Sequence, residues 1–82
     1  MNFIPSVLTI AGTDPSGGAG VQADLKTFQE LKSYGMSVIT SVVSQNTMGV
    51  QDVHHLPLSM IESQLNAVIK DIPVHAFKTG MI

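Results

Sequence analysis

Cysteine and arginine are both absent from this 82-residue chain. Without cysteine these residues hold no disulfide, no thiolate metal ligand and no cysteine nucleophile, and the composition is compatible with a reducing cytoplasm. Four lysines against six acidic residues give a net charge of −2, so the chain lacks the basic surface that binds nucleic-acid phosphates. We expect no nucleic-acid partner.

Long apolar runs are also missing. No segment approaches the roughly 20 consecutive apolar residues that cross a bilayer. The N-terminus lacks the charged region with which a secretory signal begins. The sequence therefore predicts a soluble, cytoplasmic protein that does not act at a membrane.

Hydrophobic residues are nevertheless plentiful, at 44% of the chain against 12% charged. This balance suits a sheet that is covered on both faces inside a larger protein, because 82 residues alone bury only a small core. Residues 76–82 also read as a strand that reaches its loop rather than as a natural end. We therefore expect residues 1–82 to be the N-terminal portion of a single, longer domain, or an obligate oligomer.

Hydrophobic periodicity predicts alternating strands and helices. Apolar, β-branched runs predict strands at Ser6–Ala11, Met36–Ser44 and Ala76–Met81. Apolar spacings of three and four predict helices at about Gly20–Tyr34 and Met60–Ile72. The resulting β–α–β–α–β order, with its long connections, predicts parallel strands covered by helices, which is part of an α/β sandwich.

Local signals predict the boundaries of these elements. Gly35 is placed to end the first helix in the left-handed conformation, and Ser59 with Glu62 forms a capping-box pattern for the second. Gln45–Gly49 reads as a loop, and Val50–Leu56 as a short extended piece.

The most informative segment is Gly12–Gly20, GTDPSGGAG, between the first strand and the first helix. Small ligands bind at this edge of parallel sheets, where helix N-termini present free amides. A Walker A loop would need lysine where Gly18 stands. The dinucleotide pattern at Gly18, Gly20 and Ala23 lies too far beyond the strand and lacks its acidic ribose ligand. A mobile connection is the other interpretation of such a glycine cluster.

The histidines and aspartates do not indicate a metal site. His54 and His55 are adjacent in an extended segment, so their side chains point to opposite faces, and His75 lies twenty residues further on. We expect surface histidines. Asp14, Asp52 and Asp71 likewise lack the spacing that would indicate a carboxylate site.

Three blocks of sequence carry a resemblance to a known family. They are AGTDPSGGAGVQADLKTF at Ala11–Phe28, YGMSVITSVVSQNTMGVQDV at Tyr34–Val53 and KTGM at Lys78–Met81. The chain resembles, from about Val7 onward, the N-terminal part of the hydroxymethylpyrimidine and phosphomethylpyrimidine kinases of thiamine biosynthesis, members of the ribokinase-like superfamily. The resemblance implies a three-layer α/β/α sandwich and a homodimer. It also implies that ATP, with Mg²⁺, phosphorylates 4-amino-5-hydroxymethyl-2-methylpyrimidine and then its monophosphate.

The resemblance also implies where the pyrimidine binds, over the carboxyl ends of the first strands. Gln45 is the residue whose chemistry fits best, because its amide can pair with a ring nitrogen and an exocyclic amino group at once. A solvent-facing glutamine is the alternative. Asp24 either accepts a hydrogen bond from the substrate or stabilises the helix N-terminus. The full set of implied substrate-binding residues is Gly12, Ala19, Asp24, Val43, Gln45 and Met81, for which turn geometry at Gly12 and core packing at Ala19, Val43 and Met81 are the alternatives.

The family's remaining machinery is not visible in this sequence. In that family the anion hole and the catalytic residue lie in a C-terminal glycine-rich motif that ends in cysteine, and C-terminal segments hold most of the nucleotide. We therefore expect no catalytic residue here and no ATP turnover by these 82 residues alone. Two alternatives stay open: a pyridoxal kinase of the same superfamily, which Gln45 and Asn46 argue against, and a non-catalytic ligand-binding or dimerisation module.

Overall fold

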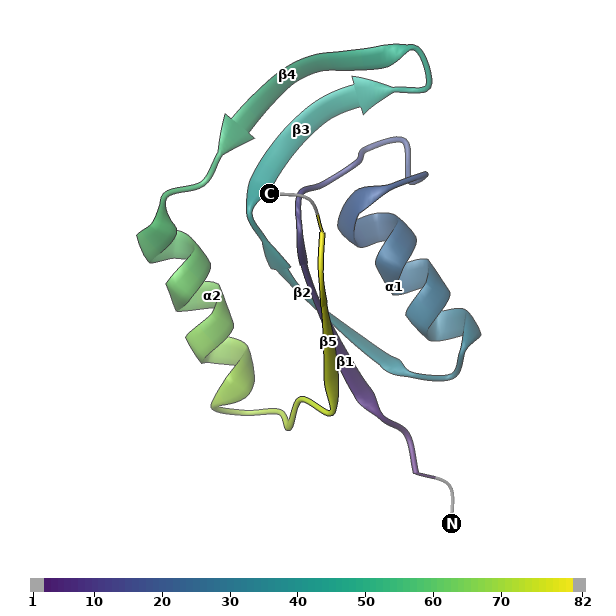
Figure 1. Cartoon of the computed structure of the whole chain (residues 1–82), viewed down its shortest axis with the longest axis vertical. Coiled ribbons are helices and arrows are strands. Elements are labelled where there is room, and N and C mark those ends of the chain that lie inside the picture. Colours follow the sequence, from purple (N-terminus) through teal and green to yellow (C-terminus); the bar gives the residue numbers. More distant parts are fainter. Residues whose placement is uncertain (1–2, 81–82) are drawn as a thin grey trace.

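Three parallel strands form the centre of the structure, a computed structural model that describes residues 3–80 (Figure 1). They are β1 (Ser6–Ala11), β2 (Tyr34–Ile39) and β5 (Ala76–Thr79), in the order β2-β1-β5. Strand β1 is therefore central and pairs in parallel with both neighbours. The prediction of a mainly parallel sheet is confirmed.

The two helices lie on opposite faces of this sheet, so the chain forms three layers (Figure 1). Helix α1 (Gly20–Glu30) covers one face, where its side chains Leu25 and Phe28 pack against Gly35 of β2. Helix α2 (Leu58–Ile69) covers the other face, where the core cluster lies. The connection from β1 to β2 runs toward one edge of the sheet, and the connection from β2 to β5 runs back toward the other. Because both connections have the same hand, their helices lie on opposite faces. The core cluster consists of Leu8, Met36 and Val38, packed against Ile10, Ile61, Leu65, Val68, Ile72 and Val74.

The predicted single strand Met36–Ser44 is wrong, because the chain changes sheets at Thr40. After β2, strand β3 (Ser41–Asn46) forms an antiparallel hairpin with β4 (Gly49–His55). Thr40 is buried, its N–H donates to the carbonyl of Ala11, and its own carbonyl accepts the N–H of Leu56. Tertiary hydrogen bonds therefore break a run that is rich in β-branched residues. The predicted extended piece Val50–Leu56 corresponds to β4.

The predicted helix boundaries also need correction. Helix α1 ends at Glu30, and the residue with a left-handed backbone after it is Lys32 (φ 58°) rather than Gly35, which belongs to β2. Gly35 instead allows close packing of α1 on β2, because a Cβ there would lie 2.9 Å from Cδ2 of Leu25 and that side chain would have to move. Helix α2 begins directly after Pro57, which is its N-cap and makes no side-chain capping bond, so the predicted capping box is wrong.

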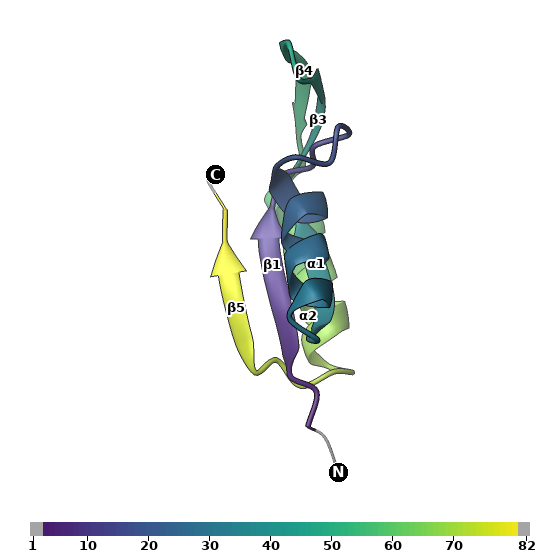
Figure 2. The ribbon, with the colours of Figure 1, turned by 90° about the vertical axis from the view of Figure 1, so that its right-hand side faces the viewer.

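Strand β5 forms an edge of the sheet that neither helix covers (Figure 2). All four of its residues are exposed, including Phe77 at 69%. At the opposite edge, the side-chain amide of Gln64 on α2 bonds both the N–H and the carbonyl of Ile39, at 2.9 and 2.8 Å. The helices thus support β2 and β1 far better than β5. Among the described residues, no helix has the length and apolar character needed to cross a membrane.

Candidate functional site

A pocket of about 290 Å³ lies at the carboxyl edge of the parallel sheet. Strands β1 and β5 end there, β3 begins there, and α1 contributes its first two turns. Parallel α/β sheets bind their ligands at this edge, because the loops that follow the strands converge there. The pocket is lined by Ala11, Gly12, Thr13, Gly20, Asp24, Ser41, Val43, Lys78 and Gly80.

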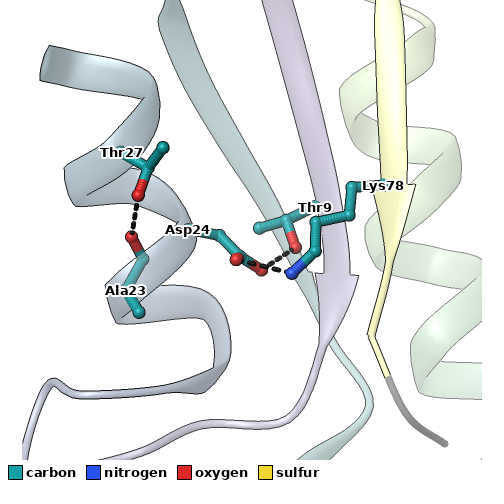
Figure 3. A network of polar contacts seen from close by, with 5 residues as sticks. All are labelled: Thr9, Ala23, Asp24, Thr27 and Lys78. Atoms are coloured by element: carbon teal, nitrogen blue, oxygen red, sulfur yellow. Dashed lines mark hydrogen bonds and ion pairs between the residues drawn. The ribbon is translucent and has the colours of Figure 1, made fainter. Parts of the chain in front are cut away.

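Asp24 is the acidic group of this pocket and is held from two sides (Figure 3). Thr9 of β1 donates its hydroxyl to Oδ2 of Asp24 at 2.6 Å, and Nζ of Lys78 on β5 contacts Oδ1 at 2.7 Å. Burial raises the pKa of Asp24, but the hydrogen bonds from Lys78 and Thr9 and the charge of Lys78 outweigh it and bring the pKa below its usual 3.8. Asp24 is therefore ionised at neutral pH and can only accept hydrogen bonds.

The glycine-rich turn is organised around Asp14, whose carboxylate is buried within the turn. Oδ1 accepts the N–H and the hydroxyl of Ser16 at 2.9 and 2.7 Å, and Oδ2 accepts the N–H of Gly18 at 3.1 Å. The N–H of Gly17 donates to the backbone carbonyl of Asp14. These amides point at the turn's own aspartate, so they are not free to bind a phosphate. Hydrogen bonds, above all the one from the Ser16 hydroxyl, keep the pKa of Asp14 below its usual value, although burial raises it.

Gly12 allows the glycine-rich turn to approach β3 closely. A Cβ on Gly12 would lie 2.7 Å from Oγ of Ser41, so any larger residue would displace the Ser41 hydroxyl. The alternative explanation, a turn that needs a left-handed backbone at Gly12, is wrong, since the positive-φ glycines are Gly17, Gly20 and Gly49. The turn is further tied to β3 by Thr13, whose N–H donates to the carbonyl of Ser41 and whose Oγ1 accepts the N–H of Val43.

The structure brings three of the six predicted site residues together in one pocket: Gly12, Asp24 and Val43. Gln45 is half-buried in β3, next to a β-bulge, and is not in the predicted loop. Ser41, Val43 and Gln45 are every second residue of β3, so their side chains lie on the same face of the strand. Gln45 is next after Val43 on this face and is not among the residues that line the pocket. Its side chain also contributes to lowering the pKa of Asp14, after the contributions of Ser16, burial and Ala19.

Of the remaining two predicted residues, Ala19 does not line this pocket. Ala19 is the exposed N-cap of α1, and Met81 lies outside the described residues. Sequence reasoning missed Lys78 and Thr9, which fix the Asp24 carboxylate, and also the pocket residues Thr13, Ser41 and Gly80. The KTGM block, which contains Lys78 and Gly80, was the available signal.

The described residues do not form a metal site by themselves. Within residues 3–80, no three His, Asp or Glu side chains come together as metal ligands would. His75 instead accepts the N–H of Ser6 through Nδ1 at 2.9 Å and packs edge-on against Phe3. Mg²⁺ requires several oxygen ligands in octahedral geometry. Asp24, the acidic group of the pocket, is already paired with Lys78.

Comparison with known proteins identifies the family. A profile of the family described as phosphomethylpyrimidine kinase matches residues 14–82. The chain belongs to this family. A hydroxymethylpyrimidine/phosphomethylpyrimidine kinase from Staphylococcus aureus is 59% identical to it over 75 residues, which cover 92% of this chain and 27% of that protein.

Solved structures of vitamin kinases share the same fold. The phosphomethylpyrimidine kinase from Clostridium difficile 630 is 55% identical and matches 95% of this chain, and 34% of its own, with a TM-score of 0.92. The pyridoxal kinase from Staphylococcus aureus is 48% identical and matches 99% of this chain, and 30% of its own, with a TM-score of 0.87. The chain thus spans about a third or less of the length of these phosphomethylpyrimidine kinase and pyridoxal kinase relatives.

Proposed function

We propose that this chain forms part of the acceptor-substrate pocket of a kinase that uses ATP to phosphorylate 4-amino-5-hydroxymethyl-2-methylpyrimidine and its monophosphate in thiamine biosynthesis. The observation that carries the proposal is the convergence of Gly12, Asp24 and Val43 on one pocket at the carboxyl edge of the sheet. Membership of the phosphomethylpyrimidine kinase family supports the reaction class. The amides of Ser16 and Gly18 are already bonded to Asp14, which argues against the glycine-rich turn as the site of the phosphate donor.

In this proposal, four of the predicted site residues have roles in holding the pyrimidine. Asp24 accepts a hydrogen bond from the amino or hydroxymethyl group, since an ionised carboxylate offers acceptors only. Val43 supplies an apolar wall, and Gly12 lets the glycine-rich turn lie close to Ser41 at the edge of the pocket. Gln45, on the same face of β3 as Val43, forms hydrogen bonds through its amide with the polar groups at the edge of the ring. ATP, when bound with Mg²⁺, supplies the transferred phosphoryl group.

Ligand binding by the 82-residue chain tests this proposal. We expect 4-amino-5-hydroxymethyl-2-methylpyrimidine to raise the melting temperature, because a ligand that binds only the folded state stabilises it. Pyridoxal is the comparison ligand, since a pyridoxal kinase is among the similar structures. Gln45→Met, which keeps the length of the side chain but removes its hydrogen bonds, should erase the preference for the pyrimidine over pyridoxal. A shift with pyridoxal alone would establish the pyridoxal kinase alternative, and a shift with NAD alone would contradict both.

We also infer that the protein is a cytoplasmic homodimer. Apolar side chains are exposed on the hairpin, where Met48 is 89% and Val50 60% accessible, and β4 is exposed along its whole length. An isolated two-stranded hairpin is only marginally stable in water, so a second chain packed against it would stabilise it. Sedimentation velocity of the chain should therefore give twice its mass of 8.7 kDa. Val50→Lys should shift the sample to monomer, and a monomeric parent chain at high concentration would contradict the dimer.

A further inference from the structure

Lys78 occupies an unusual position for a surface lysine. It lies on the uncovered strand β5, lines the pocket, and leaves 54% of its side chain exposed. Its ammonium group contacts Oδ1 of Asp24 at 2.7 Å. An ammonium group has three N–H donors, and this contact uses one of them. Two donors therefore remain for a molecule that enters the pocket.

Lys78 also decides the charge of the pocket. Among the lining residues Asp24 is the acid and Lys78 is the base, and the other seven are neutral. With both ionised the pocket is neutral overall, whereas without Lys78 it carries one negative charge. A phosphate monoester carries a charge of about −1.5 to −2 at pH 7. Such a ligand would be repelled by Asp24 unless a cation stood beside it.

The other three lysines are not placed to do this. Nζ of Lys26 donates to the carbonyl of Gly17 on the outside of the glycine-rich turn, at 3.0 Å. Lys32 follows the carboxyl end of α1, and Lys70 follows that of α2, away from the pocket lining. In the part of the chain that the structure describes, Lys78 is thus the cation of this pocket.

We propose that Lys78 is the residue that admits a phosphomonoester to this pocket, donating to the phosphate oxygens from its place beside Asp24. The inference rests on the proposed function. It assigns different binding residues to the two acceptor substrates. The monophosphate depends on Lys78, while the neutral alcohol depends on Asp24. The competing explanation is a purely structural ion pair that fastens β5 to α1, in which case loss of Lys78 would weaken both ligands equally.

Calorimetric titration of both ligands into four forms of the chain separates these explanations. The forms are the parent chain, Lys78→Gln, Lys78→Arg and the control Lys70→Met. Lys78→Gln removes the charge but keeps a donor for Asp24, so the fold is retained. We expect it to raise the Kd of the monophosphate about tenfold or more, the scale of a charge-assisted hydrogen bond. The Kd of the neutral alcohol should change by less than about threefold, as is usual for a loss of surface charge.

The two remaining variants define what counts as support. Lys78→Arg keeps the charge and should retain monophosphate binding within about threefold. Lys70→Met removes one charge outside the pocket and should leave both ligands unaffected, so an equal monophosphate loss there would reduce the effect to net charge and overturn the proposal. An equal loss of both ligands in Lys78→Gln would also overturn it.

Failure of the proposed function would look different. If the parent chain binds neither pyrimidine, the proposed function is wrong, and the same four forms are then titrated with pyridoxal and pyridoxal 5′-phosphate, another neutral and phosphorylated pair. A selective loss of the phosphorylated member in Lys78→Gln would support the role of Lys78 in this pocket. Its absence, including the absence of any binding by that pair, would refute the role.

Discussion

Gly20→Val is expected to remove most of the stability of the fold. Gly20 opens α1 with a left-handed backbone (φ 62°), and a Cβ there would lie 2.5 Å from the carbonyl oxygen of Gly12. The backbone of Thr13 and Asp14 is within 3.2 Å as well, so no flexible side chain can move aside. A left-handed residue costs roughly 1–2 kcal/mol and overpacking about 1–3 kcal/mol more. Together these costs approach the lower end of the roughly 5–15 kcal/mol of a typical domain.

Urea unfolding followed by far-ultraviolet circular dichroism measures this loss. The matched control is Gly18→Ala in the same turn, where a Cβ would meet only Oδ2 of Asp14, at an ordinary 3.8 Å. Gly18→Ala should remain within about 0.5 kcal/mol of the parent chain, as is usual for uninvolved surface positions. A Gly20→Val variant as stable as Gly18→Ala would show that the turn can rearrange, and would contradict the geometry described above.

Asp24→Asn is expected to weaken binding of the neutral pyrimidine by roughly 10- to 100-fold. A hydrogen bond to a charged group contributes about 1.5–3 kcal/mol, and each 1.4 kcal/mol is about a tenfold change in Kd. An asparagine retains one acceptor, whereas both Lys78 and Thr9 donate to the carboxylate. Calorimetric titration gives the Kd directly. Glu62→Gln makes the same charge change on the exposed surface of α2 and should leave the Kd unchanged.

The pH dependence of binding provides a second readout of Asp24. Its pKa in the folded chain lies below 3.8, so the carboxylate is ionised throughout the neutral range. Its contribution to binding, and to folding stability, should therefore be complete above pH 3.8 and should decline as the pH falls through the folded-state pKa. The same titration of Asp24→Asn reports any ionisation of the pyrimidine itself. If both forms lose affinity in parallel, the acid dependence does not come from Asp24.

Hydrophobic periodicity predicted the helices and the parallel strands they cover, and the family resemblance implied the three-layer arrangement. Leu8 and Val38 lie in buried apolar runs, and the apolar stripe of α2 packs against them. The hairpin could not be predicted in the same way. A β-branched run reads identically whether the strand continues or changes sheets, and the break at Thr40 depends on bonds to Ala11 and Leu56, which are distant in sequence.

The candidate site was predicted in part, through residues whose types recur in a family. The predicted residues Gly12, Asp24 and Val43 share the pocket. Lys78 was not predicted as a site residue, because an isolated lysine in a strand usually faces solvent. Thr9 reads as a buried strand residue until the register shows that it faces α1. Both residues were missed for one physical reason: contacts with Asp24 across 15 residues from Thr9 and 54 from Lys78 leave no periodic signal in the chain.

The bonds around Asp14 mean that the glycine-rich turn has its shape before any ligand arrives. Immobilising a flexible backbone costs about 1–2 kcal/mol of conformational entropy for each residue, and a ligand that had to order this turn would lose that amount of affinity. Here the cost is met when the chain folds, because Ser16 and Gly18 are already fixed to Asp14. The pocket therefore has a preorganised wall, and selectivity between ligands depends on how well they fit it.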